Sequence, residues 1–216
     1  MGIKIHNYPT ESTSFNSEDY YDIDAYISPG VYESKKQKGN VFLNQFSRGL
    51  FAQTGNSTPV TATTTAATII DGGVGTLTVP AGAFKVGDSF RVDMGGLITA
   101  KNNDTLTITL RSGAVILATS PAMVMPTIST PQVWHMAVNF TVRAIGAAGT
   151  AELVTLAQFH ILKVASGTQE GFAWNQVNNT TFSTTTSNTL DIQAQWSSNS
   201  ALNSIYSDIC VLNKIY

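Results

Sequence analysis

Residues 189–216 read TLDIQAQWSSNSALNSIYSDICVLNKIY. Alternate residues from 190 to 196 are apolar, and a two-residue period is that of a strand with one buried face. A polar run over 197–203 follows, and a second strand is predicted over 205–212, with apolar residues on both sides of its alternation. The chain stops shortly after this second strand. Because chain ends usually fray, we expect the second strand to be held in the middle of a sheet.

The same period occurs in many other segments between residues 49 and 216. Gly, Pro and Asn or Asp residues separate these segments, and none of them has the 3.6-residue period of a helix. Besides the two strands above, the predicted strands include 76–79, 90–94, 97–100, 106–110, 114–118, 134–142 and 153–164. This pattern predicts an all-β fold, namely an antiparallel β-sandwich of jelly-roll topology with about 8–10 strands.

Charge divides the chain near Arg48 and Gly49. Residues 1–48 carry 11 charged side chains, whereas the 168 residues of 49–216 carry 15. The first part also has few apolar positions, so it would be marginal as a domain by itself. We therefore predict a short extended N-terminal segment over 1–48, with a turn at Pro29 and Gly30, followed by one domain over 49–216.

Composition argues against several classes of protein. The net charge of −2 gives no basic surface for nucleic acid, and no apolar run is long enough to span a membrane. The start of the chain lacks the apolar stretch of a signal peptide. The single cysteine, Cys210, excludes an intrachain disulfide and a cysteine-rich metal site, and its place in a strand predicts a small buried or interface residue.

No motif predicts catalysis or a cofactor. The three histidines, His6, His135 and His160, have no partner at metal-ligand spacing, so no metal site is expected. The chain has no nucleophile elbow and no phosphate-binding loop. We expect neither enzymatic activity nor a cofactor.

Aromatic side chains flank a polar run that we interpret as a loop. Trp174 and Phe182 lie on either side of Asn178 and Asn179, and Phe172 is also near. Aromatic rings beside amides could stack on and hydrogen bond to a sugar, which would make this a receptor-facing loop. The other interpretation is that the rings close the end of the sandwich or make a subunit contact.

Several stretches resemble a known class of viral domain. These stretches are 76–80 with 85–90, then 178–182, 188–196 and 203–206. Through them, residues 49–216 resemble the C-terminal jelly rolls, of the tumour-necrosis-factor and complement-head type, of phage and large DNA virus fibres and spikes. The first part of the chain is similar to the virion-attachment segments of phage fibre proteins. The residues that carry this second similarity are Asp19, Tyr20, Asp22, Ile23, Lys35, Lys36 and Val41.

The resemblance implies a virion structural protein, such as a fibre, spike or decoration protein, at the virion surface. Residues 1–48 would bind other virion proteins, and the head would be a homotrimer that can contact a host glycan or protein. In the strand 205–212 we expect Tyr206, Cys210 and Leu212 to face outward to the neighbouring subunits. An alternative is a carbohydrate-binding adhesin module unconnected with a virion, and an enzyme is the remaining one.

Overall fold

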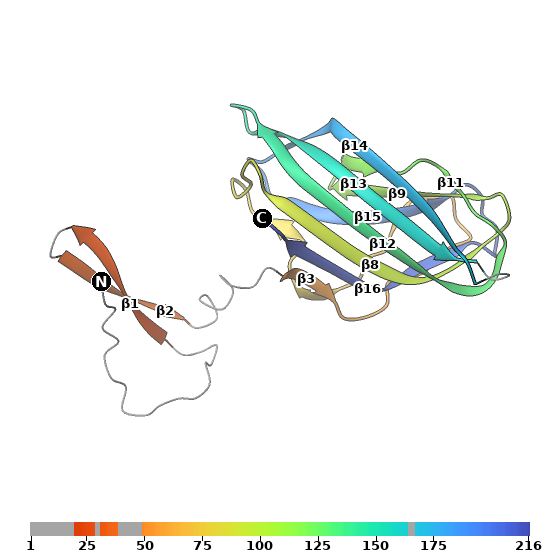
Figure 1. The fold of residues 1–216 in the computed structure, drawn as a ribbon, viewed down its shortest axis with the longest axis horizontal. Coiled ribbons are helices and arrows are strands. Elements are labelled where there is room, and N and C mark those ends of the chain that lie inside the picture. The colour runs from red at the N-terminus through yellow and green to blue at the C-terminus, as the bar shows by residue number, and fades with distance from the viewer. Residues whose placement is uncertain (1–19, 29–30, 39–48, 164–166) are drawn as a thin grey trace, which may run out of the picture. The chain divides into compact units, whose positions relative to one another are not determined.

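A computed structural model of the chain describes residues 20–28, 31–38, 49–163 and 167–216. It separates into two compact units, Met1–Arg48 and Gly49–Tyr216. The described residues form strands and contain no helix, and therefore none that could span a membrane. Figure 1 shows the strands as arrows, coloured from red at the N-terminus to blue at the C-terminus.

The first unit contains a β-hairpin. Strands β1 (Tyr20–Ser28) and β2 (Val31–Lys38) pair antiparallel. Pro29 and Gly30, the predicted turn, fall outside the described residues, but the strands on either side of them pair with each other. The described residues of this segment are therefore paired with each other as a hairpin, which the sequence analysis did not predict.

The second unit consists of an eight-stranded and a six-stranded sheet, called here the large and the small sheet. Every strand pair in both sheets is antiparallel. In order, the large sheet contains β14 (Gln169–Ser183), β13 (Thr150–Leu162), β12 (Ile128–Ile145), β8 (Ser89–Ala100), β16 (Ser204–Lys214), β3 (Gly49–Gln53) and β6 (Gly73–Gly75), with β4 (Val60–Thr61) also on β16. The small sheet contains β10 (Val115–Thr119), β9 (Thr105–Ser112), β15 (Asn188–Trp196) and β5 (Ala67–Thr68), with β11 (Met123–Val124) on β9 and β7 (Thr78–Val79) on β15.

The core lies between the two sheets, and alternation along the strands fills it. Buried residues of the large sheet include Trp134 and Met136 of β12 and Phe159 of β13, and the small sheet contributes Ile108 and Trp196. The predicted all-β antiparallel sandwich is confirmed. The jelly-roll topology stays a prediction.

Two strand assignments from the sequence need correction. The stretches 90–94 and 97–100 belong to one twelve-residue strand, β8, which continues through Gly95 and Gly96. The stretch 169–183, interpreted in part as a loop, is the fifteen-residue strand β14. In both regions glycine or a run of polar residues interrupts the alternation without ending the strand.

Strand β16 lies inside the large sheet, as predicted, between β8 and β3. The register between β16 and β8 shifts between Ser207 and Ile209, so Asp208 is an extra residue that forms a β-bulge. Residues Ile205 and Ser207 are buried before the bulge, and Cys210 and Leu212 are buried after it. The bulge therefore moves the inward-facing set from odd to even positions.

Gly96 allows the backbones of β8 and β16 to approach closely beside this bulge. Ser207 is its partner in the register, and a Cβ placed on Gly96 would overlap the carbonyl oxygen of Tyr206. That Cβ would also lie 2.7 Å from the Cα of Ser207, which real side chains do not tolerate. Only glycine fits here without moving one of the two strands.

We predict that Gly96→Ala lowers the free energy of unfolding by about 3 kcal/mol, the upper end of overpacking costs, because the new methyl group meets backbone atoms. Gly72→Ala is the matched control, since a Cβ there has no neighbour within 4 Å. Urea denaturation of both variants measures the difference. Equal stability of the two variants would show that β8 and β16 are not in close contact.

Candidate functional site

The outer face of the large sheet presents aliphatic side chains to solvent from four strands. Val133 of β12, Leu156 of β13, Val177 of β14 and Ile209 of β16 are each between 45% and 59% exposed. These residues point away from the core because their strand neighbours, such as Trp134 and Ala157, are the buried ones. In Figure 1 strands β14, β13, β12, β8 and β16 run side by side, so these residues share one broad surface. We call it the large-sheet face.

Two ion pairs lie on the large sheet. Arg91 and Asp93 on β8 form a two-pronged ion pair, with nitrogen to oxygen distances of 2.8 and 2.9 Å. The hydrogen bond from Arg91 to Asp93 and their mutual attraction raise the pKa of the guanidinium. At the edge of the same sheet Lys163 pairs with Glu170 at 2.7 Å. These four charges therefore compensate one another in pairs.

The predicted trimer interface is partly wrong. Tyr206 does lie on the large-sheet face, next to Leu97 in the register, and is half-buried. Cys210 and Leu212, however, point into the core, with exposures of 0% and 3%. Burial raises the pKa of the Cys210 thiol to about 12. The bulge at Asp208 turns Cys210 and Leu212 inward, and it places Ile209 on the outer face.

The predicted receptor-facing loop is also wrong. Trp174 and Phe182 belong to strand β14 and are only 8% and 4% exposed, so neither ring can stack on a sugar. Asn178 and Asn179 lie in the same strand, where the register with β13 is irregular. The aromatic rings fill the core instead. This agrees with the other interpretation, in which they close the sandwich.

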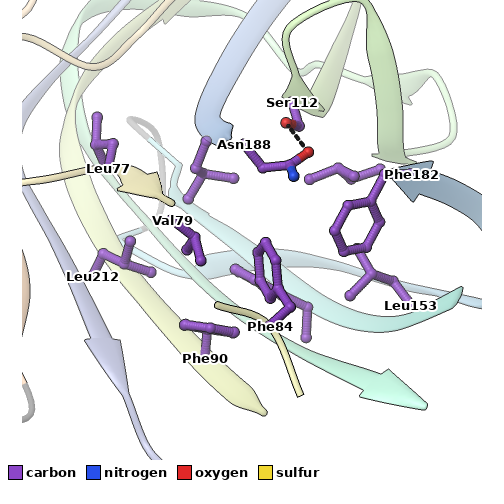
Figure 2. A pocket seen from close by; sticks show the side chains of 12 residues that line it. Leu77, Val79, Phe84, Phe90, Ser112, Leu153, Phe182, Asn188 and Leu212 are labelled. Carbon is purple, nitrogen blue, oxygen red and sulfur yellow. Dashed lines mark hydrogen bonds between the residues drawn. The ribbon is translucent and has the colours of Figure 1, made fainter. Parts of the chain in front are cut away.

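An apolar pocket lies between the sheets and is closed by the segment before β8. Figure 2 shows Phe84 among Phe90, Phe182 and Leu153 in this pocket. The ring of Phe84 makes edge-to-face contacts with those of Phe90 and Phe182, at centroid distances of 6.0 and 5.1 Å. The volume of the pocket is about 30 Å³, which is two to three times the roughly 10–15 Å³ that one water molecule needs. This pocket is part of the core and offers no room for a substrate.

A cluster of polar side chains joins the turn that follows β8 to the segment between β15 and β16. The carboxylate of Asp104 accepts hydrogen bonds from Ser198 and from the amide of Asn203, at 2.5 and 2.8 Å. Asn203 is fully buried, and its side-chain oxygen accepts the backbone N–H of Lys101 at 2.9 Å. The hydrogen bonds from Ser198 and Asn203 lower the pKa of Asp104. This carboxylate therefore has a structural role.

We predict that the Asp104 cluster makes stability depend on acidity. Because its folded pKa lies below the ordinary value of about 3.9, its contribution is complete above that value and is lost as pH falls through the folded pKa. Melting temperatures between pH 6 and pH 2 should therefore fall less steeply for Asp104→Asn than for the natural chain. Parallel curves would contradict this role.

The two histidines of the second unit lie on adjacent strands of the large sheet. His135 and His160, expected to have no partner, occupy directly opposite positions on β12 and β13. Within the described residues no group of three or more His, Cys, Asp and Glu side chains is close enough to hold a metal ion.

The proposed virion-anchor residues fall partly on the hairpin. Tyr20, Asp22 and Ile23 of β1 are opposite Lys38, Lys36 and Lys35 of β2. Asp19 and Val41 lie outside the described residues. Opposite charges thus occupy one register pair, that of Asp22 and Lys36.

Comparison with known proteins finds a weak structural similarity. No protein-family model matches the chain, and no curated protein matches it. Among solved structures, the chain is similar to the CBM2 module of the evolved Dit of Lactobacillus casei BL23 phage J-1. The TM-score is 0.26 and the identity 11%, over 64% of this chain and 69% of that chain. A likeness at this score supports no conclusion about fold or function.

Proposed function

We propose that the chain is a virion structural protein whose β-sandwich assembles into a homotrimer through the large-sheet face. The observation that carries the proposal is the group of exposed aliphatic side chains on this face, namely Val133, Leu156, Val177 and Ile209. Antiparallel sheets that face water normally have a polar outer surface. An apolar outer surface spread over four strands is typical of a contact with another molecule.

The resemblance described above supports three subunits and a place at the virion surface. Closed symmetry lets each subunit bury the same face without leaving a sticky edge. The hairpin supports the attachment role of residues 1–48, because a two-stranded hairpin is at best marginally stable alone and gains stability from a partner. In this proposal the hairpin binds other virion proteins, and the sandwich is displayed and can contact a host surface.

We predict that Leu156→Asp abolishes the trimer, because it places an unpaired charge in a desolvated contact at a cost on the order of several kcal/mol per subunit. Ile116→Asp is the matched control, since Ile116 is on β10 of the small sheet and is 49% exposed, against 51% for Leu156. Sedimentation of the full chain at micromolar concentration, with circular dichroism to verify folding, compares the three proteins. A natural chain that is monomeric, or equal effects of the two variants, would refute the assembly. A monomer that binds a glycan would favour the adhesin alternative.

Attachment has its own test. We predict that replacing residues 20–38 with a Gly and Ser linker of equal length leaves the trimer intact but removes the chain from purified virus particles. Immunoblotting of the particles measures incorporation. Normal incorporation of the replaced chain would show that the hairpin is not the anchor.

A further inference from the structure

Two histidines occupy neighbouring register positions on the large-sheet face, with a glycine on the other side of each. The register places Gly171 of β14 opposite His160 of β13, His160 opposite His135 of β12, and His135 opposite Gly95 of β8. The histidine pair is therefore flanked on both sides by residues without side chains. A surface hollow of about 120 Å³ lies over the pair, lined also by Gln169 and Leu162.

The spacing of the pair suits one metal ion. Directly opposite residues of an antiparallel pair have Cβ atoms about 4.5–5.5 Å apart. An imidazole nitrogen binds zinc at about 2.0–2.1 Å, so two rings that start from such positions can reach a common ion. His135 is exposed, and exposed side chains change rotamer within nanoseconds.

The glycine beside His160 gives its ring freedom to move. The imidazole lies over Gly171, where a Cβ would be 2.7 Å from its Cδ2 and 3.1 Å from its Nε2. A larger residue at 171 would exclude the ring from this position. With glycine there, the ring can lie over β14 or turn toward His135 and the hollow.

We propose that His135 and His160 form a two-histidine site for a divalent transition-metal ion such as Ni²⁺, Cu²⁺ or Zn²⁺. Imidazole nitrogen suits these ions, whereas Mg²⁺ and Ca²⁺ prefer oxygen ligands. The hollow offers one oxygen donor, the amide of Gln169, and no carboxylate. The nearby Glu170 is paired with Lys163, and Asp93 with Arg91, so neither adds net charge beside the ion.

The site goes beyond the proposed function and does not rest on it, because each chain supplies both histidines. It does lie on the large-sheet face, so a trimer could cover it. Metal binding is therefore measured both in the natural chain and in Leu156→Asp, whose substitution is four residues along β13 from His160.

Calorimetric titration of the full chain with NiCl₂ tests the site. We expect one ion per chain in the natural protein, in Leu156→Asp and in His6→Ala, which controls for the third histidine. Binding should be lost in His135→Ala and in His160→Ala, and none of these proteins should bind Mg²⁺. Since His135 is exposed and His160 is only half-buried, circular dichroism should show all variants folded.

Binding by Leu156→Asp alone would support the site and show that assembly covers it. Absence of binding in both the natural chain and Leu156→Asp overturns the site, whatever the state of assembly. Binding that survives loss of either His135 or His160, or that disappears in His6→Ala, also overturns it.

Discussion

The close approach of strands β8 and β16 at Gly96 is the constraint on which the rest of the sandwich depends. Strand β16 is central in the large sheet, so an error in its position would displace β3 and β4 as well. The hydroxyl of Ser207, its partner opposite Gly96, is fully buried and donates to the carbonyl oxygen of Ile69 at 2.6 Å. Buried polar groups are costly unless they are hydrogen-bonded, so this hydrogen bond holds the segment between β5 and β6 in one place. Glycine on one strand and serine on the other thus fix the centre of the sheet together.

The bulge beside this contact decides which residues of β16 are available to another molecule. If Asp208 occupied an ordinary strand position, regular alternation would place Tyr206, Cys210 and Leu212 on the same face. With the extra residue, Tyr206 and Ile209 lie outside, and Cys210 enters the core. The single bulged residue therefore makes β16 bury odd-numbered residues before it and even-numbered residues after it.

The sequence predicts regular alternation well and interruptions poorly. The segments around Ile108 and Met136 alternate cleanly, and the structure places them as strands of opposite sheets. The glycines of β8 and the polar run of β14 interrupt this alternation, and there the sequence suggests an end or a loop. The two-residue strand β5 shows no period at all, because its place comes only from pairing with β15. Strand order and the Asp208 bulge depend on contacts between distant segments, which local spacing does not contain.

Local spacing in the sequence also fails to reveal binding sites that are built from distant segments. His135 and His160 are 25 positions apart, and no metal-binding spacing in sequence joins them. The hairpin between β12 and β13 nevertheless makes them direct neighbours, and flanking glycines leave both rings accessible. Trp174 and Phe182 show the reverse, since they are near a polar run in sequence but point into the core. In an antiparallel sandwich, adjacent side chains on a face come from register pairs and from every second residue of a strand. The absence of a sequence motif therefore excludes only sites built from neighbours in sequence, and a surface site in such a fold has to be sought across the strands.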